Sequence, residues 1–163
     1  MAHDTTTKAT TKAGLRNKRG AAMGRVWADI EVSNELDEGN ASEGRLRADQ
    51  VRKIQVRALV DTGATLFVLP EENIKALGLR LQRTVQSRQA DGKLHARSVW
   101  GPAKLRVLRR EVLVEVQAAP AGVPALLGQI PLEGLDLLVD ARSQRLIPNP
   151  ESPDPEMALV DML

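Results

Sequence analysis

The most chemically suggestive stretch of the sequence places one acidic side chain, Asp61, between two apolar runs, 58–60 and 66–69. A carboxylate is costly to bury without a partner, so ordinary core packing does not explain this pattern. The small residues Gly63 and Ala64 allow the backbone to turn sharply and to approach other atoms closely. The stretch therefore predicts a carboxylate at the tip of a buried strand, where burial and neighbouring groups adjust proton affinity for catalysis.

The same residues also suit an ordinary turn, because Asp and Gly are leading turn residues. Taken alone, Asp61-Thr62-Gly63 does not decide between a turn and a functional carboxylate. The apolar runs on both sides favour the functional interpretation, which makes Asp61 the candidate catalytic residue. Two other acids, Asp136 and Asp140, also follow apolar residues, but neither precedes Thr-Gly, and we interpret both as turn or surface residues.

Composition excludes most other kinds of catalytic site. The chain of 163 residues has no Cys, which removes disulfides, thiol nucleophiles and thiolate metal ligands. Its two histidines, His3 and His95, cannot form a clustered metal site, and the sequence has neither a Gly-x-Ser-x-Gly motif nor a Gly-rich phosphate-binding loop. We therefore expect carboxylate chemistry without a metal or a cofactor.

Length and composition predict one globular domain, residues 23–147, with a tail at each end. Hydrophobic residues make up 42% of the chain and aromatic residues only 2%, so the core should be aliphatic. Residues 1–22 are rich in Thr, Lys, Ala and Gly without periodicity, and we expect them to be disordered. The acidic, Pro-rich residues 148–163 should lack regular structure.

The two ends of the chain carry opposite charge. Residues 1–25 have six basic side chains and one acid, whereas residues 148–163 have four acids and no base. A basic arm can contact nucleic acid or anionic lipid, but a solvated tail is the commoner explanation and the one we favour. The N-terminus lacks the apolar region of a signal peptide, and no apolar stretch has the length of a membrane span, so we expect a soluble cytoplasmic protein with no membrane partner.

The hydrophobic pattern predicts many short strands and few helices. Turn residues recur roughly every 8–12 residues, which fits an all-β, closed barrel-like domain with one or two short helices. The polar, Gly-containing segment 34–44 is expected to be a loop. The expected strands are 26–32, 51–60, 66–69, 80–89, 94–100, 103–108, 112–117, 137–139 and 145–147, with a charged turn at 109–111, and the expected helices are a short one starting at Pro70 and a second at 130–135.

Two motifs together resemble the pattern of the retropepsin-like aspartic proteases, the single-lobed relatives of pepsin. The first is Leu59-Val60-Asp61-Thr62-Gly63-Ala64, and the second is Leu126-Leu127-Gly128, followed by a short apolar segment. The resemblance covers residues 26–147 and implies an acid-protease fold with an aspartic endopeptidase activity. It makes Asp61 the catalytic residue, and it implies that the active site is supported by Thr62, Gly63, Ala64, Leu126, Leu127 and Gly128.

A hairpin is expected where Asp91-Gly92, a strong hairpin-turn signal, joins the strands 80–89 and 94–100. An ordinary surface hairpin explains these residues. The resemblance implies more, because a mobile hairpin at this place in the chain, the flap, closes over the substrate in that family. Ala90, Asp91 and Gly92 match its tip, and a Gly there permits close approach to a peptide backbone.

The resemblance also implies a homodimer. Aspartic proteases use two carboxylates and one water, whereas this chain has a single Asp-Thr-Gly and is too short for two lobes. The second Asp61 would come from a second chain related by a two-fold axis, with Thr62 hydrogen-bonded across that axis. Thr65 and Gln129 are neutral where viral members commonly carry an acid and an Arg that support the dimer, and we take the chain for a cellular or bacterial member.

Two alternatives to a protease of peptides and unfolded proteins stay open. One is a catalytically silent interaction or dimerisation module on the same fold, because a fold does not guarantee an activity. The other is a nucleic-acid-binding β-barrel that uses the basic N-terminal arm. The near absence of aromatic residues argues against base-stacking platforms, so we regard nucleic acid as an unlikely partner.

Overall fold

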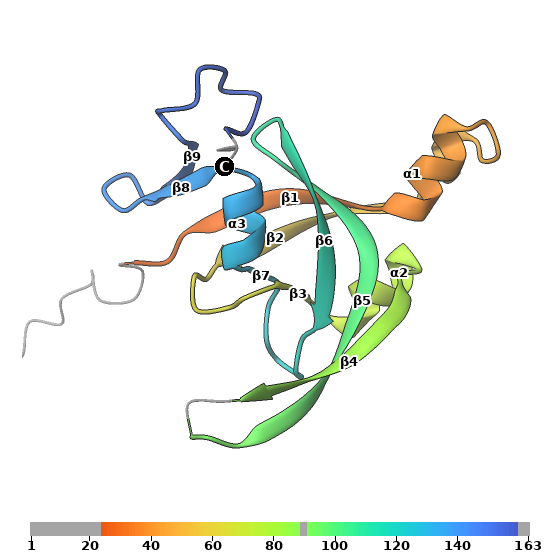
Figure 1. Ribbon diagram of the computed structural model, residues 1–163, viewed down its shortest axis with the longest axis horizontal. Helices are drawn as coiled ribbons and strands as arrows, with labels where there is room; N and C mark the ends of the chain where they lie inside the picture. The colour runs from red at the N-terminus through yellow and green to blue at the C-terminus, as the bar shows by residue number, and fades with distance from the viewer. Residues whose placement is uncertain (1–23, 89–90, 160–163) are drawn as a thin grey trace, which may run out of the picture.

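The computed structural model describes residues 24–88 and 91–159 (Figure 1). These residues form a mostly β structure with short helices, as the sequence pattern predicts. The helices are α1 (Glu35–Ser42), α2 (Glu71–Leu77), α3 (Gln129–Gly134) and the 3-10 turn η1 (Ala48–Gln50). The strands are β1 (Trp27–Asn34), β2 (Lys53–Val60), β3 (Phe67–Leu69), β4 (Arg80–Arg88), β5 (Leu94–Val107), β6 (Arg110–Ala118), β7 (Leu126–Leu127), β8 (Leu137–Asp140) and β9 (Arg145–Pro148).

Seven of the strands belong to one sheet, in the order β1-β2-β7-β3-β6-β5-β4. An additional antiparallel pairing between β1 and β5 brings the sheet back towards its own first strand. Strands β8 and β9 form a separate hairpin beside α3 (Figure 1). The predicted all-β character is confirmed at this level, whereas the closed barrel and the two-fold homodimer stay predictions.

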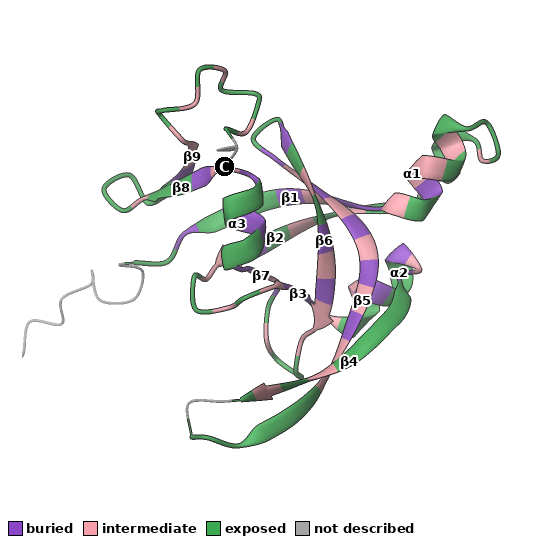
Figure 2. Ribbon diagram, in the orientation of Figure 1, coloured by how far each residue is buried: buried purple, intermediate pink, exposed green. Residues whose placement is uncertain are grey.

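The core is aliphatic, as the composition predicts. Buried positions recur along β1, β5 and β6 (Figure 2). Phe67 is the only fully buried aromatic residue of the described chain, and Trp27 is 39% exposed. Val, Ile and Leu side chains fill most of the remaining core, and Ile30, Leu105 and Leu127 have no exposed surface. Burying such side chains supplies the main driving force of folding.

The predicted loop at 34–44 is wrong, because residues 35–42 form helix α1. The Asn34 side chain caps the helix by accepting hydrogen bonds from the backbone N–H groups of Leu36 and Asp37, at 2.9 and 3.2 Å. Three acids in the first turn add a favourable interaction with the helix dipole. The helix lacks an apolar stripe and contains Gly39, which is why the hydrophobic pattern did not predict it.

The other elements follow the expected order. Helix α2 ends at Gly78, which adopts the left-handed conformation with φ of 59°, as expected for a glycine C-cap. The strands predicted at 94–100 and 103–108 form one long strand, β5, with a register shift between Trp100 and Ala103. Beyond β5, the turn lies one residue earlier than predicted, at Leu108 and Arg109, which both have positive φ.

Arg110 was expected in the charged turn, but it begins β6 and is only 2% exposed. Its guanidinium donates to the backbone carbonyl of Leu135 at 2.9 Å and to that of Pro155 at 3.0 Å, and it pairs with Asp136. Pro148 belongs to β9, so the prediction of no regular structure from residue 148 is wrong at that residue. Residues 149–159 have neither helix nor strand, as the prolines predict, yet these contacts tie them to the domain. The division into a domain and two tails stays a prediction, and residues 1–22 lie outside the described chain.

A cluster of charged side chains fastens α1 to β5. Glu38 accepts two hydrogen bonds from the Arg106 guanidinium, at 2.7 and 2.8 Å, and one from the Lys104 ammonium at 2.9 Å. Hydrogen bonds from Arg106 lower the pKa of Glu38 to about 2, against the desolvation that accompanies its burial. The Ser33 hydroxyl donates to the same carboxylate. The side chain of Glu38 is 19% exposed, so solvent screens this cluster only partly.

We expect Glu38→Gln to lower the free energy of unfolding by on the order of 2–3 kcal/mol at neutral pH, because the folded state holds this carboxylate ionised. The folded pKa lies below the ordinary value of 4.5. The stabilisation is therefore complete above pH 4.5 and disappears as the pH falls from about 4.5 to about 2. Urea unfolding of both proteins across this range measures the difference.

Glu71→Gln is the matched control, because Glu71 is 70% exposed and lies 3.9 Å from Lys75. An exposed pair of this kind contributes about 0–1 kcal/mol, so the control should unfold like the unmodified chain. A difference between Glu38→Gln and the unmodified chain that stays constant from pH 7 to pH 2 would contradict the assignment.

Candidate active site

Strand β2 ends directly before Asp61. This strand pairs antiparallel with β1 and parallel with β7, where Leu59 lies opposite Leu126 and Val60 opposite Leu127. The backbone N–H of Asp61 continues this parallel pairing by donating to the Leu127 carbonyl at 3.0 Å. Asp61 directly follows the last residue of β2, so the predicted position at the tip of a strand is confirmed. The predicted burial of that strand is wrong, because Ala58 is its one buried residue, and Asp61 itself is half-buried.

A tight turn over residues 61–64 holds the carboxylate. The N–H of Ala64 donates to the Asp61 carbonyl at 3.1 Å, and the N–H of Gly63 donates to Asp61 Oδ1 at 2.9 Å. A Cβ at Gly63 would lie 3.1 Å from Oδ1, so the absent side chain leaves space for the carboxylate. From the described residues, Asp61 Oδ2 accepts no hydrogen bond, which leaves this oxygen available for a reacting group or a second carboxylate.

The second motif packs against this turn through backbone contacts. A Cβ at Gly128 would lie 2.6 Å from the carbonyl oxygen of Ala64 and would overlap that of Leu66 as well. The next two residues, at the start of α3, donate their N–H groups to the turn: Gln129 to the Ala64 carbonyl at 2.8 Å, and Ile130 to the Thr65 carbonyl at 3.1 Å. The two motifs predicted from the sequence are therefore brought together as one backbone assembly.

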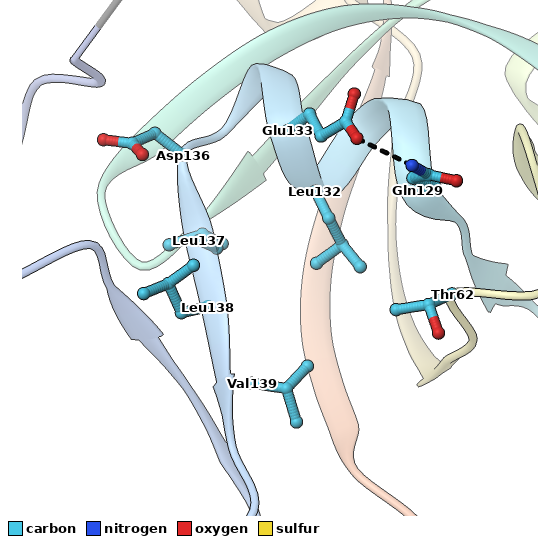
Figure 3. A pocket seen from close by; sticks show the side chains of 8 residues that line it. All are labelled: Thr62, Gln129, Leu132, Glu133, Asp136, Leu137, Leu138 and Val139. Atoms are coloured by element: carbon cyan, nitrogen blue, oxygen red, sulfur yellow. Dashed lines mark hydrogen bonds between the residues drawn. The ribbon is translucent and has the colours of Figure 1, made fainter.

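An open groove of about 570 Å³ lies beside the turn (Figure 3). Thr62 borders it on one side, and Leu137, Leu138 and Val139 of β8 border it on the other, with α3 between them. Leu138 is 47% exposed and Val139 is 40% exposed, so the groove presents apolar surface to solvent. At its rim, the Gln129 side chain donates to Glu133 at 2.8 Å within α3.

The hairpin tip lies apart from this assembly. Asp91 and Gly92 are exposed at the turn between β4 and β5, with the N–H of Lys93 donating to Asp91 Oδ1 at 3.0 Å. Gly92 has φ of 81°, the conformation that its type predicts. No hydrogen bond or ion pair between described residues joins the tip to Asp61, and Ala90 lies outside the described residues.

The two other candidate acids have structural partners. Asp136 accepts hydrogen bonds from the Asn149 side chain and from the backbone N–H of Leu159, both at 2.9 Å. The hydrogen bond from Leu159 is the main cause that lowers the pKa of Asp136. Asp140 accepts from the N–H of Arg142 in the turn that follows β8. Across residues 24–88 and 91–159, no group of three His, Cys, Asp or Glu side chains has the arrangement of a metal site.

The sequence did not reveal the apolar groove or the role of the α3 N-terminus. The groove arises because β8 turns back past α3 and leaves Leu138 and Val139 without a described covering element. The N-terminal donors of α3 were predictable in principle, because a helix start places unpaired N–H groups next to whatever precedes it. The helix was expected to begin at residue 130, one residue after its actual start at Gln129, so the contact that Gln129 makes with the turn was not predicted.

The chain matches a known protein family over the residues that form this assembly. The model of a family described as aspartyl protease matches residues 42–129, a range that contains the Asp61 turn and the second motif. Among solved structures, the protease of simian foamy virus (mac) matches with 21% sequence identity and a TM-score of 0.41, covering 65% of this chain and 90% of that one. A search of curated proteins found no match.

We expect Gly128→Ala to lower the free energy of unfolding by about 1–3 kcal/mol, because the new methyl group would overlap two backbone carbonyls that cannot rotate away. Thermal or urea unfolding measures the loss.

Gly39→Ala is the matched control, because a Cβ there meets no atom within 4 Å and the residue lies inside α1. This substitution should raise the free energy of unfolding by about 0.5–1 kcal/mol, through the higher helix propensity of Ala. Equal stability of the Gly128→Ala protein and the unmodified chain would contradict the close approach at Gly128.

Proposed function

Because the chain belongs to the aspartyl protease family, we propose that it is an aspartic endopeptidase that works as a homodimer. In this proposal, two Asp61 carboxylates, one from each subunit, activate a water molecule that attacks the peptide bond. The observation that carries the proposal is the arrangement of Asp61. Its backbone is fixed by β7, one carboxylate oxygen is held by Gly63, and the other oxygen accepts no hydrogen bond from the described chain.

The chemistry requires two carboxylates because each performs a different task. Two carboxylates about 3 Å apart cannot both ionise, so they share one proton. The ionised member accepts a proton from the attacking water, while the protonated member donates a hydrogen bond to the carbonyl of the bond to be cleaved. The two members exchange roles as the proton moves, and their acidity belongs to the pair.

A second chain is the natural source of the second carboxylate. Asp-Thr-Gly occurs once in the sequence, and the other two candidate acids have the structural partners described above. A two-fold axis beside Asp61 would place two copies of this residue face to face, and two-fold dimers are the commonest oligomers. Thr62, which follows Asp61 and is exposed, would then lie near its own copy.

The apolar groove beside Thr62 supports a second copy as its occupant. The groove adjoins the turn that carries Asp61, so a chain bound there would lie close to the carboxylate. Its exposed Leu138 and Val139 would lose contact with water on assembly, which favours association. Thr65 and Gln129 are neutral, so the dimer would depend on this apolar contact more than on charge.

An extended peptide is the substrate that the fold suits best. Residues 94–98 of β5 pair with β4 and with no other described strand, so the hairpin formed by β4 and β5 can add a peptide strand at this open edge or close over one. The tip residues Ala90, Asp91 and Gly92 would then contact the peptide backbone.

Asp61→Asn should reduce cleavage of a diverse peptide pool by a factor of about 100 or more, because it removes the acid–base pair. A sharper result concerns mixtures. If each site needs one Asp61 from each chain, we expect an equal mixture of Asp61→Asn and unmodified chains to keep about a quarter of the activity that the same total amount of unmodified chain shows. The reason is that random pairing after subunit exchange leaves about that fraction of dimers with two unmodified chains. Mass spectrometry of the products gives the rates.

An activity of one half in this mixture would contradict a shared site. A purified dimer of the unmodified chain that cleaves nothing in the pool from about pH 4 to pH 7.5, the range that spans a carboxylate pair and neutral conditions, would instead support the silent interaction module.

Leu138→Glu should weaken the dimer and reduce cleavage in parallel, because it introduces a charge into the apolar groove that a second copy would cover. Sedimentation velocity measures the dimer at several protein concentrations. The matched control is Leu113→Glu, since Leu113 is 57% exposed on β6 and does not line the groove. Equal dimer dissociation constants for the two variants would contradict this use of the groove.

A further inference from the structure

The hairpin formed by β4 and β5 is strongly basic. Between residues 80 and 97 it carries five basic side chains, not counting His95, and a single acid, Asp91. Two of the five have partners: Arg83 forms two hydrogen bonds with Glu115, and Lys93 lies 3.5 Å from Asp91. Arg97 differs from the others because it is half-buried, and it makes no ion pair with a described residue.

Arg97 lies where β5 separates from β6. Pairing between these strands begins at Val99, opposite Gln117, so residues 94–98 have β4 as their one described neighbour. Their other edge is open and offers backbone hydrogen bonds to an extended chain. At this point a hollow of about 260 Å³ opens between β5 and the loop that follows β6. We call it the Arg97 hollow, and it is lined by Arg97, Ser98, Trp100, Pro120, Glu71 and alanines of both segments.

Two buried donors in the Arg97 hollow lack an acceptor. Arg97 Nε and the indole Nε1 of Trp100 are both buried, and neither has a hydrogen-bond partner in the described chain. Buried donors are nearly always paired in folded proteins, so an unpaired donor requires an explanation. Both donors belong to residues that line the same hollow, so a bound molecule that supplies an acceptor would complete their hydrogen bonding.

A carboxylate fits these donors best. The guanidinium is a permanent cation that matches the two oxygens of a carboxylate, and the indole N–H adds a neutral donor. Glu71 also lines the hollow, but its carboxylate lies near Lys75 and does not satisfy either buried donor. The positive charge of the whole hairpin favours an anionic ligand further.

We propose that the Arg97 hollow binds a Glu or Asp side chain of the peptide substrate, and that Arg97 determines this specificity. The peptide would lie along the open edge of β5 at residues 94–98 and place its carboxylate between Arg97 and Trp100. This inference rests on the proposed function, because it takes the bound molecule to be the peptide that the enzyme cleaves.

The test measures binding on an Asp61→Asn background, so that the result does not depend on cleavage. The probes are fluorescent eight-residue peptide pools with amidated ends, in which one position holds Glu or Gln and the others hold Ala, Leu or Val. At one position, Glu should bind on the order of tenfold more tightly than Gln, and Arg97→Gln should bring this ratio to about one. Arg97→Glu should reverse the preference, favouring a pool with Lys at that position.

Arg80→Gln is the matched control, because it removes the same charge from the base of the same hairpin and Arg80 does not line the hollow. It should keep the ratio, and circular dichroism should show that all variants are folded. Equal binding of Glu and Gln pools at every position, or an unchanged ratio in Arg97→Gln, would overturn the inference.

Cleavage of the same pools by the unmodified chain separates the two proposals. If the chain binds the Glu pool selectively but cleaves no pool, the proposed protease activity fails and the carboxylate site stands. If it cleaves the Glu and Gln pools equally well and binds them equally, the protease stands and the carboxylate site fails.

Discussion

The parallel contact between β2 and β7 is the constraint on which the rest of the site depends. The hydrogen bond from the Asp61 N–H to the Leu127 carbonyl fixes where the first motif ends relative to the second. This contact also places Gly128 under the turn, where only a residue without a side chain fits. Backbone groups, which cannot change rotamer, therefore position the carboxylate. An active site held in this way is preorganised, because the orientation of its acid depends little on neighbouring side chains.

The structure separates the charged clusters that provide stability from the candidate active site. Charged side chains around Glu38 secure α1 against β5, and the buried Arg110 ties residues 149–159 to the end of α3. By contrast, the turn around Asp61 contains no ion pair between described residues. Its surroundings are backbone amides and an apolar groove.

None of the helices in the described chain is long and apolar enough to cross a bilayer.

The sequence predicted most strands, and the two motifs that the structure brings together, because both leave local signals. Alternation of apolar and polar residues identified the strands, Asp61 was identified by the apolar runs on both sides of it, and Gly128 was identified by the family resemblance of its motif. Helix α1 was missed because its stability comes from the Asn34 cap and from ion pairs with β5, which is distant in sequence. The burial of Arg110 and the hollow at Arg97 depend likewise on contacts between segments far apart in the chain, which no local pattern encodes.

The exposed edge strand β4 has a consequence for solubility. An unpaired strand edge is a template for pairing with the same edge of another copy, which is a route to aggregation. Here that edge carries Arg80 and Arg88 at its two ends, so two copies of β4 paired antiparallel would place like charges opposite each other. The same charges attract a strand of opposite sign. The charge of this edge therefore acts before any side chain reaches a pocket. It repels a second copy of β4, whereas it leaves the edge open to an acidic chain.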